Sequence, residues 1–161
     1  MNILGLDPGK LNFAYSVIDT DTFEPSYGML VHTVKDLTSK TDSQGRDFSH
    51  EIRGIIKRFK IDYIVAERYM NRGRTGTTNE VINIMLGLII AQSPKIPKQL
   101  ITAAQWKNSF NKIDCLNTVY GESRLVPHVI DATFIALYGS RFFGQNLMNE
   151  RSINTVLDYL K

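Results

Sequence analysis

Three short runs of apolar residues open the chain, separated by turn-forming residues. The first covers Asn2–Asp7 and stops at Pro8-Gly9, a dipeptide that favours a turn. Leu11–Asp19 alternates apolar and polar positions, and Tyr27–Val34 is a further strand-like run. Alternation with a period of two is typical of strands. The pattern therefore predicts a three-stranded antiparallel meander at the start of the chain.

A helical pattern follows a polar connection over Ser39–Gly45. Apolar residues recur there at offsets of 0, 4, 7, 8 and 11, which places them on one helix face: Phe48, Ile52, Ile55, Ile56 and Phe59. Tyr63–Ala66 then predicts a short buried strand that ends at Glu67. The segment Asn71–Thr78 is rich in Gly, Thr and Arg, so we expect a loop.

The second half of the chain alternates helices with a further strand. Thr78 or Asn79 can cap a helix that runs to about Gln92 and is apolar on nearly all sides. We expect the later elements in this order: a strand over Lys98–Ile101, a short helix capped by Thr102 and carrying Trp106, an irregular polar segment over Asn111–Ser123, a helix from Pro127 to Tyr138, and a last helix over Ser152–Leu160. Three strands followed by alternating helices and strands predict a mixed α/β sheet flanked by helices, the later strands parallel, in one domain over residues 1–161.

Composition narrows the class of protein only mildly. The 161 residues are 43% hydrophobic and 22% charged, which is normal for a globular domain. A net charge of +3 and a pI near 9.0 permit a nucleic-acid partner without requiring one. The single cysteine, Cys115, cannot form an internal disulfide, and no signal peptide or membrane span is evident. We therefore expect a cytoplasmic protein with no membrane partner, and its compact size and lack of a targeting segment suit a bacterial or phage-infected cell.

Two carboxylates occupy equivalent positions in this pattern. Asp7 and Glu67 each end a short apolar strand just before a turn or loop. In open α/β sheets, ligands collect at the carboxyl ends of strands. Two carboxylates there repel each other unless a hard cation such as Mg²⁺ lies between them.

A second pair of candidate ligands lies three residues apart on the helix that begins at Pro127. His128 and Asp131 share one face of this otherwise apolar helix. Each candidate has an ordinary structural alternative: Asp7 as a turn residue, Glu67 as a surface acid, His128 as a satisfied helix residue and Asp131 as a partner of the helix dipole. The four together, on these elements and in this order, indicate a metal site more strongly than any one of them.

These motifs resemble those of the RuvC family of Holliday-junction resolvases. NILGLDPG, followed by Asn12 to Val17, resembles the family's opening motif. VAERYM with the Gly/Arg loop and the apolar helix resembles its second motif, and PHVIDATFIALY resembles its last. The resemblance spans about Asn2 to Tyr138 and implies a ribonuclease H-like fold, a site for two divalent metal ions, and structure-selective cutting of branched DNA in recombination and repair.

Carried over residue by residue, the resemblance makes Asp7, Glu67 and Asp131 metal-binding carboxylates. His128 occupies a position where some members have aspartate and others histidine. It is expected to be a fourth metal ligand or the general base for the attacking water. Mg²⁺ is the expected metal, and Mn²⁺ is plausible because an imidazole nitrogen tolerates it.

Basic and aromatic residues cluster near these motifs and are the expected DNA contacts. Trp106-Lys107 resembles a stretch where the family carries a functional lysine, and Tyr69 resembles an aromatic that meets unstacked bases. The full set of expected DNA contacts is Lys10, Arg68, Tyr69, Arg72, Arg74, Lys107, Lys112 and Arg124. The segment from Lys112 to Arg124 departs from the family's glycine- and lysine-rich pattern, which weakens the inference of strict selectivity for four-way junctions.

Other functions remain open on the sequence. A flap, fork or structured-RNA nuclease on the same fold is one, and a branched-DNA-binding module that does not cut is another. An actin-like phosphotransferase would need a second phosphate-binding half, for which 161 residues leave no room.

Assembly is predicted from the apolar helix over residues 79–92. Cutting a four-way junction symmetrically takes two active sites, so we expect a two-fold homodimer. This helix has almost no polar face, and we expect an isologous contact to cover its surplus apolar surface: Val81, Ile82, Ile84, Met85, Leu86, Leu88, Ile89 and Ile90. The alternative is a helix covered entirely by its own sheet and neighbouring helices.

Overall fold

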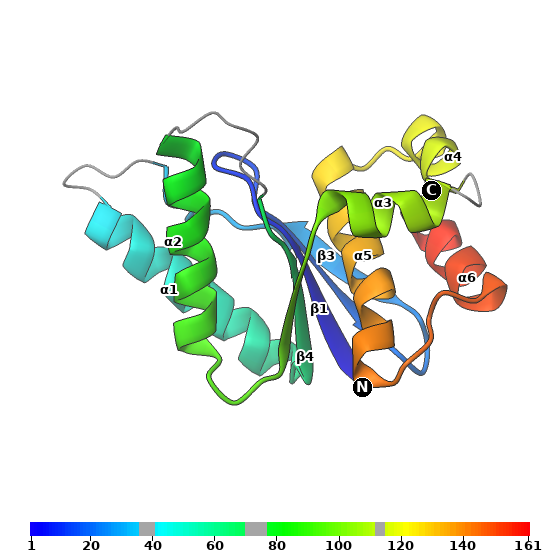
Figure 1. Ribbon diagram of the computed structural model, residues 1–161, viewed down its shortest axis with the longest axis horizontal. Helices are drawn as coiled ribbons and strands as arrows, with labels where there is room; N and C mark the ends of the chain where they lie inside the picture. The colour runs from blue at the N-terminus through cyan, green and yellow to red at the C-terminus, as the bar shows by residue number, and fades with distance from the viewer. Residues whose placement is uncertain (36–40, 70–76, 112–114) are drawn as a thin grey trace.

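A mixed five-stranded sheet forms the centre of the molecule, as the sequence predicted (Figure 1). The computed structural model describes residues 1–35, 41–69, 77–111 and 115–161. The strand order is β3-β2-β1-β4-β5, in which β1, β2 and β3 are antiparallel while β4 and β5 run parallel to β1. The strands span Asn2–Asp7 (β1), Ala14–Asp19 (β2), Pro25–Met29 (β3), Tyr63–Glu67 (β4) and Lys98–Ile101 (β5).

Helices cover both faces of this sheet (Figure 1). One face carries α1 (Thr41–Phe59) and α2 (Thr77–Gln92), which also pack against each other. The other face carries α3 (Ala103–Asn111), α4 (Cys115–Glu122), α5 (Pro127–Gly139), the short 3₁₀ helix η1 (Ser140–Phe143) and α6 (Glu150–Leu160). No helix in the described ranges is long and apolar enough to cross a membrane.

The alternation of side chains along β1 determines which of its residues lie on each face of the sheet. Leu4 and Leu6 belong to the apolar cluster beneath α1 and α2, while Ile3 belongs to the cluster beneath α3–α6. Because successive side chains of a strand point to opposite faces, Asp7 lies on the same side as Ile3. The first candidate ligand therefore faces α5.

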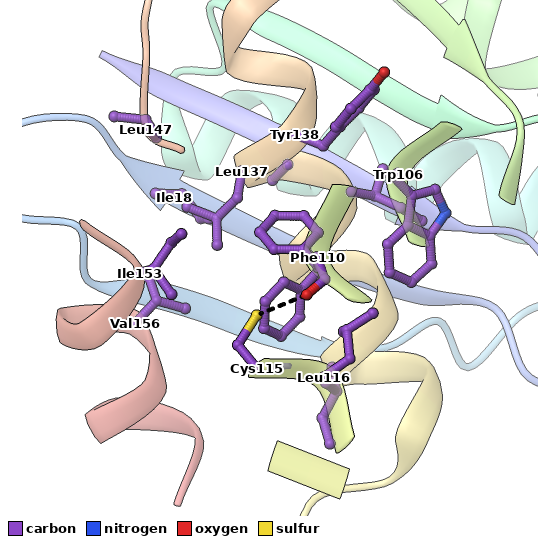
Figure 2. Close-up of a cluster of buried hydrophobic side chains, with 14 of the residues drawn as sticks. Ile18, Trp106, Phe110, Cys115, Leu116, Leu137, Tyr138, Leu147, Ile153 and Val156 are labelled. Atoms are coloured by element: carbon purple, nitrogen blue, oxygen red, sulfur yellow. Dashed lines mark hydrogen bonds between the residues drawn. The ribbon is translucent and has the colours of Figure 1, made fainter. Parts of the chain in front are cut away.

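The cluster beneath α3–α6 joins four helices to the sheet. Figure 2 shows Trp106 and Phe110 of α3, Cys115 and Leu116 of α4, and Ile153 of α6 around it. The rings of Phe110 and Phe134 meet edge to face, with centroids 4.6 Å apart. This shared core fixes the positions of α3 and α4 relative to α5, which matters for the site described below.

Two glycines allow α5 to lie directly on the sheet. A Cβ added to Gly5 of β1 would come within 2.1 Å of the Ala132 carbonyl oxygen, and one added to Gly139 within 2.2 Å of the Val65 side chain. Neither position has room for any side chain, so glycine sets the close approach of helix and strand. This approach brings the first turn of α5 over the carboxyl end of β1.

One prediction for the second half of the chain is wrong. Residues 115–122, expected to be irregular, form α4. The helix buries Cys115, Leu116 and Val119 on one face, a spacing of 0, 1 and 4 that fits a short amphipathic helix. Its polar exposed face obscured that signal in the sequence.

The boundaries of other elements also differ from the expectation. α1 begins at Thr41, so part of the expected connection over Ser39–Gly45 is its first turn, which lacks apolar periodicity because it is largely solvated. The third strand is Pro25–Met29 rather than Tyr27–Val34, because its antiparallel pairing stops at Met29, opposite Ala14, the first residue of β2. The expected loop over Asn71–Thr78 lies mostly outside the described residues.

Candidate active site

Asp7 and Glu67 come together because β1 and β4 are parallel neighbours. Their pairing runs to Leu6 opposite Ala66, and the two acids are the next residues on each strand. Val65 of β4 faces the α3–α6 cluster, so Glu67 lies on that side of the sheet as well. The two carboxylates thus share one face at one end of the sheet, as their sequence positions indicated.

The start of α5 adds the other two candidate residues. Val126 precedes the helix in an extended conformation, and Pro127 occupies its first turn, where the missing N–H costs nothing. His128 follows in the first turn, and Asp131 lies three residues further along the helix, on the same face. The sheet side of this turn meets β1, so all four predicted residues belong to the same end of the molecule.

His128 contacts Asp7 directly. Its Nδ1 lies 2.7 Å from Asp7 Oδ2. An ionised carboxylate only accepts hydrogen bonds, so the ring N–H on Nδ1 is the donor. In the neutral imidazole this leaves Nε2 with a lone pair, which can take up a proton or bind a metal ion.

Glu67 and Asp131 have partners from α3 and α4. The indole Nε1 of Trp106 donates to Glu67 Oε2 at 2.7 Å. Lys107 Nζ lies 3.1 Å from Asp131 Oδ2, and the Tyr120 hydroxyl donates to Asp131 Oδ1. Each candidate acid is therefore bound by at least one side chain that is not an acid.

Burial and the neighbouring acids raise the pKa values of Asp7 and Glu67. The pKa of Asp7 is raised from 3.8 to about 6: burial is the largest cause, the charges of Asp131 and Glu67 add to it, and the hydrogen bond and charge of His128 oppose it. Burial also raises the pKa of Glu67, against the opposing effects of Trp106 and Lys107. Converging buried carboxylates with raised pKa values are typical of functional sites.

Tyr120 stays protonated in this setting. Burial, and then the hydrogen bond to Asp131 and its charge, raise the pKa of the Tyr120 phenol well above its usual range. The hydroxyl is therefore a neutral donor to the carboxylate at any pH at which the protein would work.

The chemistry of this donor set fits a hard divalent cation. Three carboxylates and one imidazole are ligands that Mg²⁺ and Mn²⁺ accept. As the side chains stand, however, no group of three or more His, Cys, Asp or Glu residues in the described ranges is arranged as a metal site.

The expected DNA-contact residues fall into three groups. Arg68 and Tyr69 are exposed just after β4, and Arg124 is exposed just before α5. Lys10, after β1, is half-buried. Lys107 lies inside the site, on Asp131. Arg72, Arg74 and Lys112 lie outside the described residues.

Two residues of the site were not identified from the sequence. Trp106 was expected only as part of a short helix, and Tyr120 fell in a segment expected to be irregular. The helical spacing of Cys115, Leu116 and Val119 was the signal that could have placed Tyr120 on a helix next to α5. Nothing in the sequence around either residue indicates that its side chain contacts one of the candidate acids.

Comparison with known proteins was made by sequence and by structure. No protein-family model matches the chain, and no curated protein matches its sequence. Among solved structures, RuvC of Thermus thermophilus in complex with a Holliday junction substrate matches with a TM-score of 0.66 at 17% identity, covering 88% of this chain and 96% of that one. A second T. thermophilus RuvC structure matches with the same score and identity, covering 90% and 98%.

A more distant structure shares the same architecture. The yeast mitochondrial Holliday junction resolvase matches with a TM-score of 0.51 at 14% identity, over 98% of this chain and 76% of that one. These similarities show that the chain has the ribonuclease H-like fold of RuvC, as the sequence motifs implied.

Proposed function

We propose that this domain is a metal-dependent endonuclease that cuts four-way junctions or other branched DNA by hydrolysing phosphodiesters. The observation that carries the proposal is the gathering of Asp7, Glu67, His128 and Asp131 at the carboxyl end of β1, with Asp7 buried and directly bound by His128. Support comes from the fold, which is that of two structures named as RuvC and one named as a junction resolvase. We further propose that it acts in the cytoplasm of a bacterial or phage-infected cell.

The four residues would hold two divalent cations, Mg²⁺ or Mn²⁺. Bound divalent cations polarise a phosphodiester and lower the pKa of water towards neutrality, which supplies a hydroxide nucleophile. Asp7 lies between Glu67 on the next strand and His128 and Asp131 on α5, so it would hold the cations together with residues of both elements. The carboxylate charges that repel one another would then be neutralised.

The protein's own side chains would prepare the reaction in two ways. His128, oriented by its hydrogen bond to Asp7, would present Nε2 either as a ligand or as the base that accepts a proton from the attacking water. Lys107, on Asp131, adds a positive charge where a scissile phosphate would approach.

DNA would be held by basic residues at the same end of the sheet. Lys10, Arg68 and Arg124 would contact phosphates, and the exposed ring of Tyr69 would stack on an unpaired base. Arg72, Arg74 and Lys112 belong to the same proposal on the strength of the sequence alone.

A second copy of this chain would bind through α2. The helix buries Val81, Ile82, Met85, Leu86 and Ile89 in its own core, yet Ile84 and Ile90 remain 36% and 49% exposed. Ile84 and Leu88 also line a groove of about 680 Å³ between α1 and α2, together with side chains of both charges, Asp42, Arg46, Asp47 and Arg53. An apolar strip beside charges of both signs suits a self-complementary contact.

A nicking assay on defined substrates tests the proposed activity. The purified chain is incubated with Mg²⁺ or Mn²⁺ on a four-way junction, a flap, a fork, a linear duplex and a structured RNA. We expect cutting of the junction or another branched DNA, leaving 5′-phosphate and 3′-hydroxyl ends, and none in a chelator.

Each other result would point elsewhere. Cutting of RNA or of linear duplex alone would replace the substrate while keeping the nuclease. Binding to branched DNA without any cutting in either metal would replace the enzyme with a binding module.

A further inference from the structure

Both oxygens of the Asp131 carboxylate are engaged by side chains from neighbouring helices. The Tyr120 hydroxyl of α4 donates to Oδ1, and Lys107 Nζ of α3 lies 3.1 Å from Oδ2. A carboxylate offers about four lone-pair positions, so two remain for other partners. Two donors on opposite oxygens fix the torsion of the side chain as well as its location.

The two donors differ in chemistry. Lys107 is an ion-pair partner that can also serve a phosphate, and its ring-face contact with Trp106, at 4.8 Å from the centroid, keeps it beside the site. Tyr120 is a neutral donor with a single O–H group, so it orients the Asp131 carboxylate without neutralising its charge. Glu67 likewise has a neutral donor, because the Trp106 indole N–H donates to it.

Tyr120 contacts Asp131 from a part of α4 that is not buried in the core. The helix is anchored by buried Cys115, Leu116 and Val119, while Tyr120 itself is 37% exposed. The Ser123 hydroxyl, just beyond the helix, donates to the Leu160 carbonyl and ties this end of α4 to α6. The backbone of α4 is thus held without the Tyr120 hydroxyl, which is left to serve Asp131.

We propose that Tyr120 is a positioning residue that orients the Asp131 carboxylate towards a divalent cation. The inference rests on the proposed function, since it assumes that Asp131 is a metal ligand. Hydrogen-bond partners behind a ligand fix its orientation, and their removal typically costs about 10- to 100-fold in metal affinity or activity. Removing only the hydroxyl of Tyr120 should therefore weaken metal binding while leaving the fold intact.

Isothermal titration calorimetry with MnCl₂, on the full chain without DNA, measures this directly. The proteins compared are wild type, Tyr120→Phe and the control Tyr159→Phe, which removes the hydroxyl of an exposed tyrosine on α6. We expect Tyr120→Phe to bind Mn²⁺ about 10- to 100-fold more weakly than wild type. The control should bind as wild type does.

Two further readouts separate orientation from folding and from DNA binding. The melting temperature of metal-free Tyr120→Phe should equal that of wild type within error. In the nicking assay at a fixed, subsaturating Mn²⁺ concentration, kcat should fall while KM for the branched substrate stays unchanged.

The outcomes distinguish this inference from the proposed function. Wild type that binds no Mn²⁺ would overturn the proposed metal site and this inference with it. Wild type that binds Mn²⁺, together with Tyr120→Phe of equal affinity, would overturn the positioning role alone. A metal-free melting temperature that falls in Tyr120→Phe would assign the hydroxyl to folding and would also overturn it.

Discussion

Nδ1 of His128 lies 2.7 Å from Oδ2 of Asp7, although 121 positions separate the two residues in the chain. The contact joins the carboxyl end of β1 to the first turn of α5. It exists because Gly5 lets α5 lie on the strand and Pro127 starts the helix one residue before His128. The proposed chemistry and much of the expected response to mutation follow from this pair and its surroundings.

Asp7→Asn should abolish cutting and stabilise the metal-free protein. The pKa of Asp7 is raised from 3.8 to about 6. At 1.36 kcal/mol per pKa unit, keeping this carboxylate ionised at pH 7 costs the folded state about 3 kcal/mol. An amide removes that charge at little change in volume. We expect a gain of about 1–3 kcal/mol, roughly 3–10 °C in melting temperature for a domain of this size. DNA binding in the absence of cutting should persist.

The pH dependence of this difference provides the check. A carboxyl whose folded pKa is raised stabilises the fold most below its unfolded value and loses that contribution as pH rises through the folded value. The free-energy difference between Asp7→Asn and wild type should thus be small near pH 4, grow between pH 4 and 6, and level off above. Urea unfolding in chelator at each pH measures it. A free-energy difference that does not vary with pH would contradict a buried Asp7 carboxyl with a raised pKa.

His128→Asp should retain part of the Mg²⁺-dependent activity, and His128→Ala should lose far more. Both histidine and aspartate can ligate a metal, whereas alanine cannot. Single-turnover cutting rates on the preferred branched substrate compare the three proteins. Equal loss in both variants would mean that the imidazole itself is required, either as a base through Nε2 or as the hydrogen-bond donor to Asp7 through Nδ1.

Replacing Arg68 and Arg124 by alanine should weaken DNA binding and reduce its dependence on salt. Both side chains are exposed beside the site. Each lost phosphate contact should lower the slope of log K against log salt by about 1. Arg151→Ala on α6, an exposed arginine that lies over the Phe23 ring, is the matched control and should leave the slope unchanged. Identical slopes in all variants would place the DNA on another surface.

Gly5→Ala should destabilise the fold strongly, while Gly54→Ala should not. The added methyl at Gly5 would meet the Ala132 carbonyl at 2.1 Å and push α5 from the sheet, at a cost of about 1–3 kcal/mol or more. Gly54 lies exposed in α1 with no atom within 4 Å of the added methyl, so alanine there should stabilise by about 0.5–1 kcal/mol. Thermal unfolding of both variants gives the comparison. Near-equal stability would show that α5 does not lie as close to β1 as described.

Ile84→Glu should break the proposed dimer without unfolding the chain. Ile84 is exposed on α2 and lines the groove beside α1, so a charge there is tolerated by a monomer but is costly in an apolar contact. Light scattering at micromolar concentration, with and without junction DNA, should show a dimer for wild type and a monomer for the variant. A wild-type monomer in both conditions would remove the dimer and favour a flap or fork substrate.

The sequence by itself determined the elements whose signals are local. β1 and its terminal Asp7, β4 and Glu67, and the start of α5 at Pro127 follow from apolar periodicity, turn residues and helix-start preferences, which depend on near neighbours in the chain. The spacing of His128 and Asp131 on one helix face is equally local. The mixed sheet follows from the order of these elements, and the fold of RuvC follows from the motifs they carry.

Only the tertiary structure decided which side chains meet. Trp106 contacts Glu67, and Lys107 and Tyr120 contact Asp131, each pair on different elements and 39, 24 and 11 positions apart in the chain. These contacts are set by how α3 and α4 pack on the shared core around Phe110 and Phe134. The same packing stabilises residues 115–122 as a helix, because the burial of Leu116 and Val119 supplies stability that the local sequence alone does not. A pairing that depends on the assembly of several elements leaves no periodic trace in any one of them.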